Sequence, residues 1–284
     1  MILPTDMSPI YKKDDLLFFK GNRNDESDDR LIIDASKIDF ISNYMQKNSL
    51  KSIMINSAYF PINNLAFLKS FTFVERIFIV DNNLDITPLN NLKQLLVIRM
   101  GAFTGVIDFD NFPSLQVLGI NWTNKLKNLE NSKNLTGLWL DNYKMNDLER
   151  LGNFDKLSYL YLYKPSITSL KGIEDMYSLR ELNIDTASKL ESLDGLHDAN
   201  KNLINLDVYN ASKLTGYSAL AYLVNLEKLR FTKTGDMNDI HIFKLLPNLK
   251  RVVLGTKVLD GNMSYLKDIK EYKFKNFPHY NLKS

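Results

Sequence analysis

A six-residue hydrophobic pattern recurs along the chain, with leucine or another large apolar residue at its first, fourth and sixth positions. The intervening positions vary and are often polar. Successive copies begin 20 to 24 residues apart, with a mean of about 22, and this spacing predicts one repeated structural unit over residues 50–275. The eleven copies start at Leu50, Val74, Leu95, Leu115, Leu135, Leu157, Leu179, Leu203, Leu226, Leu249 and Ile269.

The alternation within each copy has the two-residue period of a β-strand with one buried face. A lone strand cannot pair its backbone, and about 22 residues leave room for one compact crossover before the next parallel strand. We therefore predict an α/β solenoid, a right-handed superhelix with a parallel concave β-sheet of about eleven strands. Short 3₁₀ or irregular turns would form its convex side.

The segments between the hexapeptides fit this prediction. In residues 166–178, apolar side chains recur at every third position, as a short helical turn beneath the sheet requires. Three Lys-Leu pairs follow strands, and their leucines (Leu126, Leu190 and Leu214) are predicted to enter the core. All prolines at positions 61, 88, 113, 165 and 247 fall outside the hexapeptides, as expected for strands within a sheet.

The two ends differ from the repeats, which suggests that they cap the solenoid. Residues 16–19 and 30–34 are predicted to form a hairpin around an acidic turn, and residues 36–47 have helical spacing. We assign residues 1–49 to an N-terminal cap, 50–275 to the solenoid and 276–284 to a short C-terminal tail. Lys273 and Lys275 alternate along the last strand, a common way to protect a sheet edge.

The repeated Leu-x-x-Leu-x-Leu hexapeptide resembles the leucine-rich repeat family, and the unit length and Lys-Leu turns are similar to bacterial internalin-like and Bacteroidetes-type repeats. The resemblance implies a concave sheet that binds other macromolecules. One departure leaves the geometry of several turns open. The family usually has asparagine shortly after the final strand leucine, where this chain has Tyr143, Pro165, Ala187 and Ala211, although Asn82 matches.

The variable hexapeptide positions are predicted to form the concave face. Tyrosine and tryptophan bunch near its middle, acidic residues lie beside them, and basic residues follow. Aromatic side chains in such a place often anchor a partner, although tyrosine ladders also stabilise sheets by themselves. The predicted partner-binding residues are Trp139, Asp141, Tyr159, Tyr161, Tyr163, Glu181, Asp185, Asp207, Tyr209, Arg230 and Arg251.

Composition gives little support to catalysis. The 284 residues contain no cysteine, which excludes disulfides, thiolate metal sites and cysteine nucleophiles. The three histidines are scattered, and the acidic residues at 25–29 and at Asp108 and Asp110 lack the spacing of a calcium loop. Neither a glycine-rich phosphate loop nor a nucleophile elbow is present. We predict no enzyme activity, no cofactor and no metal; an enzyme would need a cluster of acid–base or metal-binding side chains that folding brings together.

Charge raises a second possibility for binding. The formal net charge of +3 combines +7 for residues 228–284 with −4 for the rest. The basic C-terminal strands could bind nucleic acid or an anionic surface, or their lysines could simply protect the sheet edge.

We predict a non-catalytic protein–protein recognition module that binds another protein on its concave face. A narrower alternative is an immunity-type inhibitor of a bacterial toxin or enzyme. We expect a monomer with no membrane span and disfavour a nucleic-acid partner. The lack of an apolar run of signal-peptide length favours a cytoplasmic location; a secreted or surface location would require a signal peptide that has been removed.

Overall fold

The computed structural model describes residues 10–21, 29–151 and 154–283. Contacts within the chain divide it into two compact units, Met1–Ser132 and Lys133–Ser284. Each of the eleven hexapeptides carries one strand of a parallel ladder, at the position that the sequence pattern predicts. We describe the units separately as unit 1 and unit 2.

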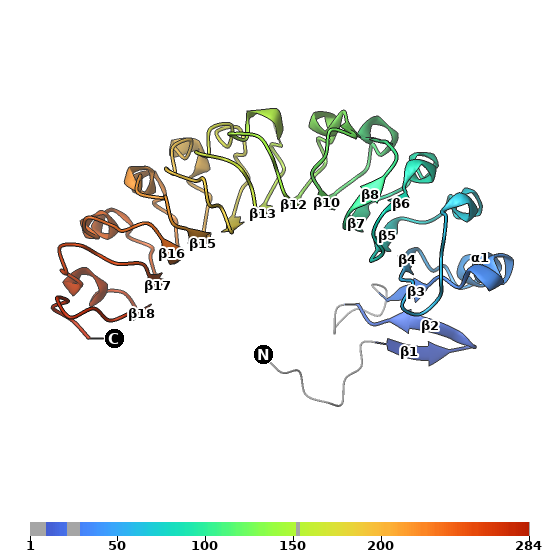
Figure 1. Ribbon diagram of the computed structural model, residues 1–284, viewed down its shortest axis with the longest axis horizontal. Helices are drawn as coiled ribbons and strands as arrows, with labels where there is room; N and C mark the ends of the chain where they lie inside the picture. The colour runs from blue at the N-terminus through green and yellow to red at the C-terminus, as the bar shows by residue number, and fades with distance from the viewer. Residues whose placement is uncertain (1–9, 22–28, 152–153, 284) are drawn as a thin grey trace. The chain divides into compact units, whose positions relative to one another are not determined.

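Unit 1 contains a sheet that starts antiparallel and becomes parallel (Figure 1). Strands β1, β2 and β3 pair antiparallel, and from β3 onward each strand pairs parallel with the next. Helix α1 (Ile38–Lys47) lies between β3 and β4 in the chain. The sheet strands are β1 (Ile10–Lys13), β2 (Leu16–Phe19), β3 (Arg30–Ile32), β4 (Ser52–Ile55), β5 (Arg76–Ile79), β7 (Val97–Met100) and β10 (Val117–Asn121).

The crossovers of unit 1 are short 3₁₀ helices with small parallel ladders beside them. The helices are η2 (Ala35–Lys37), η3 (Ala66–Ser70), η4 (Thr87–Asn91), η5 (Phe109–Asn111) and η6 (Leu129–Asn131). The ladders join β6 (Leu84–Asp85) to β8 (Phe103–Thr104) and β9 (Ile107–Asp108) to β11 (Leu126–Lys127). Asp108 and Asp110 both accept hydrogen bonds from Asn128 Nδ2, at 2.9 and 2.8 Å, so these carboxylates tie neighbouring turns together.

Unit 2 is a run of parallel strands that line one side, with its 3₁₀ helices on the other side (Figure 1). The strands are β12 (Gly137–Asp141), β13 (Tyr159–Tyr163), β14 (Glu181–Asp185), β15 (Asn205–Ala211), β16 (Lys228–Thr234), β17 (Arg251–Gly255) and β18 (Glu271–Phe274). The 3₁₀ helices are η7 (Glu149–Leu151), η8 (Asp198–Asn200), η9 (Ser218–Tyr222), η10 (His241–Leu245) and η11 (Ser264–Leu266).

The core of unit 2 lies between its strands and its turns. Alternate residues of β13 and β14 are buried, and Leu190 and Leu214 of the Lys-Leu turns are buried as predicted, as is Leu126 in unit 1. Residues 166–178 bury all four of their regularly spaced apolar side chains, but they form no helix. Instead, three backbone hydrogen bonds link Leu170 to Ile173, Ile173 to Met176 and Met176 to Leu179, each spanning one turn. The three-residue period therefore reflects linked single turns.

In the turns without the usual asparagine, the backbone itself makes the hydrogen bond to the neighbouring repeat. The residue directly after each of β12, β13 and β14 has a positive φ: Asn142 (57°), Lys164 (51°) and Thr186 (58°). The amide of each of these three residues donates to a carbonyl of the next strand, at 2.7 to 2.9 Å. The next side chain, such as Tyr143 or Ala187, is then buried, so packing occupies the place of the asparagine ladder.

Two side chains in unit 1 do not lie where the strand pattern placed them. The pattern puts Met54 and Phe78 on the exposed concave face, yet they are only 4% and 7% exposed. They pack with Ile32, and Ile10, Leu17, Phe19, Phe60 and Val97 contact this cluster. The expectation of an open face is therefore wrong at β4 and β5, because residues from the β1–β2 hairpin and Phe60 lie over it.

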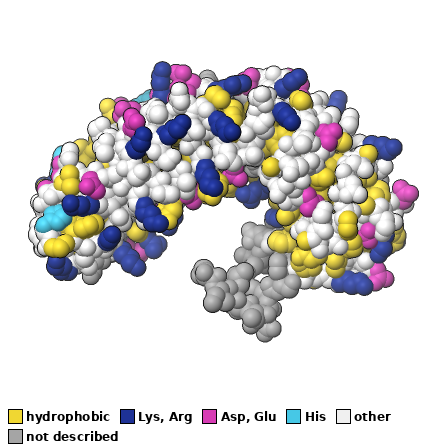
Figure 2. All heavy atoms as spheres, viewed as in Figure 1, with side chains coloured by type: hydrophobic (Ala, Val, Ile, Leu, Met, Phe, Trp, Pro, Cys, Tyr) yellow, Lys and Arg dark blue, Asp and Glu magenta, His cyan; other side chains and the backbone are white. Residues whose placement is uncertain are grey.

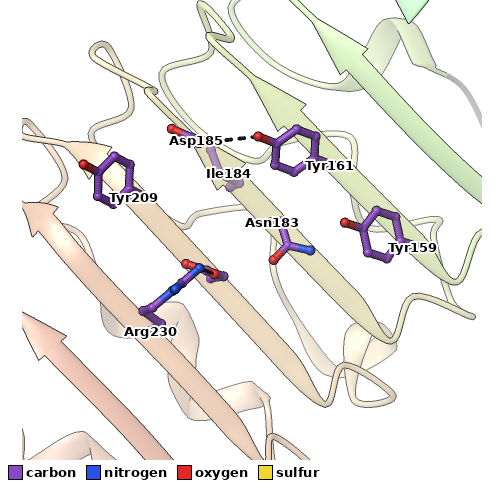
Figure 3. A pocket seen from close by; sticks show the side chains of 8 residues that line it. Tyr159, Tyr161, Asn183, Ile184, Asp185, Tyr209 and Arg230 are labelled. Carbon is purple, nitrogen blue, oxygen red and sulfur yellow. Dashed lines mark hydrogen bonds and ion pairs between the residues drawn. The ribbon is translucent and has the colours of Figure 1, made fainter. Parts of the chain in front are cut away.

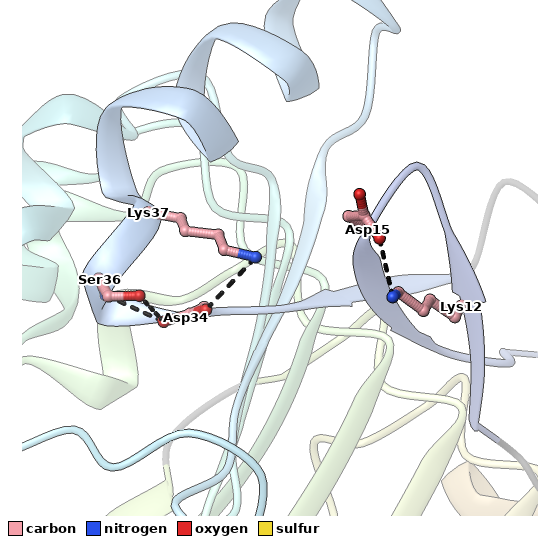
Figure 4. A network of polar contacts seen from close by, with 5 residues as sticks. All are labelled: Lys12, Asp15, Asp34, Ser36 and Lys37. Carbon is pink, nitrogen blue, oxygen red and sulfur yellow. Dashed lines mark hydrogen bonds and ion pairs between the residues drawn. The ribbon is translucent and has the colours of Figure 1, made fainter.

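The hairpin and the start of α1 are held by local polar contacts (Figure 4). Asp14 and Asp15 both have positive φ, as a tight two-residue hairpin turn requires, and Lys12 Nζ lies 2.8 Å from Asp15 Oδ1. The sequence pattern missed β1, because it is short and lacks alternation. Asp34 caps η2 by accepting from the Ser36 amide (3.0 Å) and hydroxyl (2.7 Å).

The residues after β18 fold back onto the last repeat. Tyr280 is 5% exposed, and its hydroxyl accepts a hydrogen bond from the Val258 amide at 2.7 Å. Its ring contacts Phe274 and Phe277, with centroids 5.9 and 5.3 Å away. This small aromatic cluster covers the apolar end of unit 2 that the last strand would otherwise expose.

Candidate functional site

The candidate site is the face of the unit 2 sheet that turns away from the core, which we call the inner face. Strand register aligns equivalent hexapeptide positions across it, as the sequence predicts. The middle row runs Trp139, Tyr161, Asn183, Asp207, Arg230, Val253 and Lys273. Side chains in this row are half-buried from β12 to β15, and Arg230 is exposed. The inner face is therefore accessible without any rearrangement of the core.

Aromatic rings gather on β12 and β13. The rings of Trp139 and Tyr159 lie 4.5 Å apart between centroids and are tilted by 31°. Tyr161 is the register partner of Trp139, so three aromatic side chains occupy adjacent inner-face positions. Tyr163 lies at the end of the same strand, and Lys164 Nζ is 4.9 Å from its ring centroid. This arrangement presents a large aromatic area to a partner.

A pocket of about 220 Å³ opens between β13 and β16 (Figure 3). We call it the tyrosine–aspartate pocket. The Tyr161 hydroxyl donates to Asp185 Oδ2 at 3.4 Å, and the Thr186 hydroxyl donates to Asp185 Oδ1 at 2.8 Å. Arg230 forms an ion pair with Asp207 Oδ2. The lining residues are Tyr159, Tyr161, Asn183, Ile184, Asp185, Asp207, Tyr209 and Arg230.

A second pocket of about 230 Å³ lies beside the first and has the opposite charge. It shares Asp207 and Arg230 with the tyrosine–aspartate pocket and adds Lys228 and Arg251. Arg251 Nε is 3.5 Å from Glu271 Oε2, whereas no ion pair of Lys228 occurs among the described residues. The Asp207–Arg230 ion pair thus lies at the boundary where the inner face changes from acidic to basic.

The structure brings together most, but not all, of the predicted binding residues. Six of them line the tyrosine–aspartate pocket: Tyr159, Tyr161, Asp185, Asp207, Tyr209 and Arg230. Arg251 lines the basic pocket. Trp139 reaches the group through its ring contact with Tyr159, whereas Asp141, Tyr163 and Glu181 lie on the same face outside both pockets. The binding role of these eleven residues stays a prediction.

The sequence analysis missed two lysines that contact the tyrosine rings of the inner face. Lys233 Nζ donates to the Tyr209 hydroxyl at 2.9 Å and lies 5.2 Å from its ring centroid, and Lys164 makes the ring contact with Tyr163. Lys233 lies near the end of β16 and Lys164 directly follows β13, and both have positive φ, of 55° and 51°. That backbone conformation cannot be foreseen from a strand pattern, although their equivalent places in two repeats offered a weak signal.

Burial and like charges shape the ionisation of this site. Burial raises the pKa of the Asp141 carboxyl, and Lys164 partly opposes that shift. The pKa of Tyr161 is raised to about 12, first by burial and then by the negative charge of Asp185 and its hydrogen bond. The hydrogen bond to Asp207 raises the pKa of Arg230. Burial is thus the main cause of the shifts at Asp141 and Tyr161, and the charge of Asp185 adds to the shift at Tyr161.

We expect Tyr161 to stay protonated at pH 10 to 11, where ordinary tyrosines ionise. Because the unfolded chain ionises this phenol first, its contribution to stability is complete below about pH 10 and is lost as pH rises toward 12. Absorbance titration of phenolate at 295 nm should lose one late-titrating group in Tyr161→Phe. Asp185→Asn should lower the pKa of Tyr161, and an unchanged titration curve in that variant would contradict the contribution assigned to Asp185.

The described residues contain no group of side chains arranged as a metal site. No three histidine, cysteine, aspartate or glutamate side chains there are placed to hold a metal ion. His241 pairs with Asp239, and His279 Nε2 lies 2.9 Å from the Val258 carbonyl oxygen, so neither contact brings a histidine together with two carboxylates. None of the described helices is long and apolar enough to cross a membrane.

Comparison with known proteins identifies the fold. No protein-family model and no curated protein matches the sequence. Among solved structures, the chain is similar to one in the Toll–Spätzle complex of Drosophila, with a TM-score of 0.57, 17% identity and coverage of 79% of this chain and 30% of that chain. It is also similar to one in the TLR13–ssRNA13 complex, with a TM-score of 0.56, 13% identity and coverage of 78% and 36%.

The chain has the leucine-rich repeat fold. This confirms the resemblance inferred from the repeated hexapeptides. An internalin, InlF from Listeria monocytogenes, is similar over 87% of this chain and 92% of its own, at 17% identity and a TM-score of 0.47. The chain spans about a third of the two longer leucine-rich repeat chains. At 13% and 17% sequence identity, the similarity to these two longer chains shows the fold alone.

Proposed function

We propose that this leucine-rich repeat chain is a non-catalytic recognition module that binds another protein on the inner face of unit 2. The observation that carries this proposal is the accessible Trp139, Tyr159 and Tyr161 group beside two pockets of opposite charge. Tyrosine and tryptophan supply large contact areas with few rotatable bonds, and they are enriched among the residues that dominate binding energy. Solenoids of this type use their extended inner sheet for binding.

The size of the inner face suits a modest interface. Seven strands spaced about 4.8 Å apart, each contributing about five residues, give a projected area of roughly 500 Å². A standard protein interface buries about 800 Å² on each partner. The partner would therefore also contact side chains at the strand ends, where Lys164 and Lys233 lie.

Replacement of both Trp139 and Tyr161 by alanine should weaken partner binding by at least about 30-fold. Both side chains are half-buried on the face opposite the leucine core, so the fold should remain intact. The partner would be isolated by affinity capture from the native host, identified by mass spectrometry and titrated by calorimetry.

The matched control replaces two exposed tyrosines outside the inner face, Tyr177→Ala and Tyr222→Ala, which are 49% and 47% exposed. This control should bind the partner normally. Equal affinity of the inner-face variant and the wild type would reject the inner face as the binding site.

The charges of unit 2 favour protein over nucleic acid. Three basic residues of its C-terminal repeats face acidic partners: Arg230 with Asp207, Arg251 with Glu271, and Lys250 with Glu227 at 2.7 Å. Figure 2 shows Lys and Arg side chains dispersed among acidic and uncharged ones. Nucleic-acid binding would lose affinity steeply with added salt, so a weak salt dependence is expected for the captured complex. The narrower role as a toxin inhibitor stays a prediction.

A further inference from the structure

We propose that the tyrosine–aspartate pocket receives a cationic side chain, lysine or arginine, from the protein partner. This inference rests on the proposed function, because it names the partner chemistry that the inner face selects. The pocket combines three tyrosines (Tyr159, Tyr161 and Tyr209) with two carboxylates (Asp185 and Asp207). Aromatic faces and carboxylates both attract an ammonium or guanidinium group.

The volume of the pocket indicates the size of its occupant. At about 220 Å³, it is smaller than the roughly 300 to 1,000 Å³ of pockets that hold small-molecule ligands or cofactors. It opens onto the inner face between β13 and β16, as Figure 3 shows. A single side chain that projects from a docked protein fits this size and this opening.

The charge of the pocket selects a cation over an anion. Inner-face positions of β12 to β15 include four acidic residues (Asp141, Glu181, Asp185 and Asp207) and no basic residue. Arg230 is the one cation among the lining residues and forms an ion pair with Asp207, so the pocket holds two carboxylates against one guanidinium group. A partner cation beside Asp185 would remove this imbalance.

The contacts of Asp207 give an independent observation. Arg230 contacts its Oδ2, whereas its Oδ1 is buried and has no hydrogen-bond partner among the described residues. A buried carboxylate oxygen without a partner is poorly stabilised in the unbound protein. Added positive charge in the adjoining pocket would therefore be favourable even without direct contact with Oδ1, through the charge of the carboxylate as a whole.

The arrangement also predicts where an acidic group of the partner would lie. The neighbouring pocket is lined by Lys228, Arg230 and Arg251, so a cation is disfavoured there. An acidic group of the partner would therefore lie in this second pocket. A cationic probe should perturb the tyrosine rings of the tyrosine–aspartate pocket and leave the second pocket unaffected.

The experiment uses the full chain and two short peptides, Ac-Gly-Gly-Lys-Gly-Gly-NH₂ and the same peptide with norleucine in place of lysine. Norleucine keeps the four-carbon side chain and removes the charge. With tyrosine rings labelled by carbon-13, the lysine peptide should progressively shift the ring signals of Tyr161 and Tyr209. The norleucine peptide should not shift them.

Variants separate a local contact from a general field effect. Asp185→Asn, which removes a lining carboxylate, should weaken lysine-peptide binding about fivefold. Asp194→Asn is the matched control: it makes the same chemical change in the same repeat, at an exposed residue outside the sheet, and should alter affinity less than twofold. Arg230→Met should strengthen binding, because it removes the competing cation, whereas a merely structural role for Arg230 predicts weaker binding.

Ring shifts of equal size with both peptides, or no shifts with the lysine peptide, would overturn the cation assignment. So would equal weakening by Asp185→Asn and Asp194→Asn. If the wild-type chain does not bind the lysine peptide, but Trp139 and Tyr161 still control its affinity for the captured partner, only the cation assignment fails and the protein-recognition proposal stands. Conversely, if the lysine peptide binds but the alanine replacements of those two residues do not change the affinity for the captured partner, only the recognition proposal is rejected.

Discussion

Replacement of Gly195 by alanine is expected to destabilise the protein by at least about 3 kcal/mol. Gly195 has a φ of +114°, a conformation that side-chain-bearing residues rarely adopt, and this strain alone costs about 1 to 3 kcal/mol. A Cβ atom at this position would also overlap the carbonyl group of Leu170 and lie 2.6 Å from Lys171 N. These atoms are backbone of the neighbouring repeat, so no rotamer change can relieve the overlap.

Urea denaturation followed by circular dichroism measures this effect, with Gly119→Ala as the control. Gly119 lacks a positive φ, and the nearest atoms to its added Cβ belong to the flexible Arg99 side chain, at 3.1 Å and beyond. The control should change stability by less than about 1 kcal/mol. If the two variants unfold at the same urea concentration, close backbone contact between the repeats is not what requires glycine at position 195.

We expect Phe78→Ala to cost about 3 kcal/mol, close to the effect of emptying a buried core position. Phe78 is 7% exposed, packs with Ile32 and Met54, and has the Arg30 guanidinium carbon 3.5 Å above its ring centroid. The loss should be local. Hydrogen exchange measured by mass spectrometry should show reduced protection in the β1–β2 hairpin.

Val80 offers a matched control. It lies two residues after Phe78, directly beyond the end of β5, and is 53% exposed. Val80→Ala should change the free energy of unfolding by less than about 0.5 kcal/mol. Similar losses in the two variants would mean that the cover over β4 and β5 adds no stability.

The sequence was sufficient to predict the eleven strands of the repeats and the orientation of the inner-face residues of unit 2. Both depend on a two-residue period that repeats eleven times, so an error in one copy is corrected by its neighbours. It also placed Trp139, Tyr161 and Asp207 on one row, because parallel register follows from equal positions in each repeat. A row of residues, however, does not specify which side chains form a pocket.

What the sequence could not supply depends on contacts between separate segments. The burial of Met54 and Phe78 requires a hairpin from outside the repeats, and that hairpin has no repeat to reinforce its pattern. The Asp207–Arg230 ion pair requires two particular rotamers on adjacent strands. The ring contact of Lys164 requires a left-handed residue at the strand end, a conformation that lysine seldom adopts.

The alternating burial of β13 and β14 also has an evolutionary consequence. Their buried leucines stabilise the fold, whereas the intervening side chains face outward and contribute little to the core. Substitutions at the outward positions can therefore accumulate with small losses of stability, and selection can adjust partner choice almost independently of folding. On β4 and β5 the same positions are buried under the hairpin, so that part of the chain should diverge more slowly.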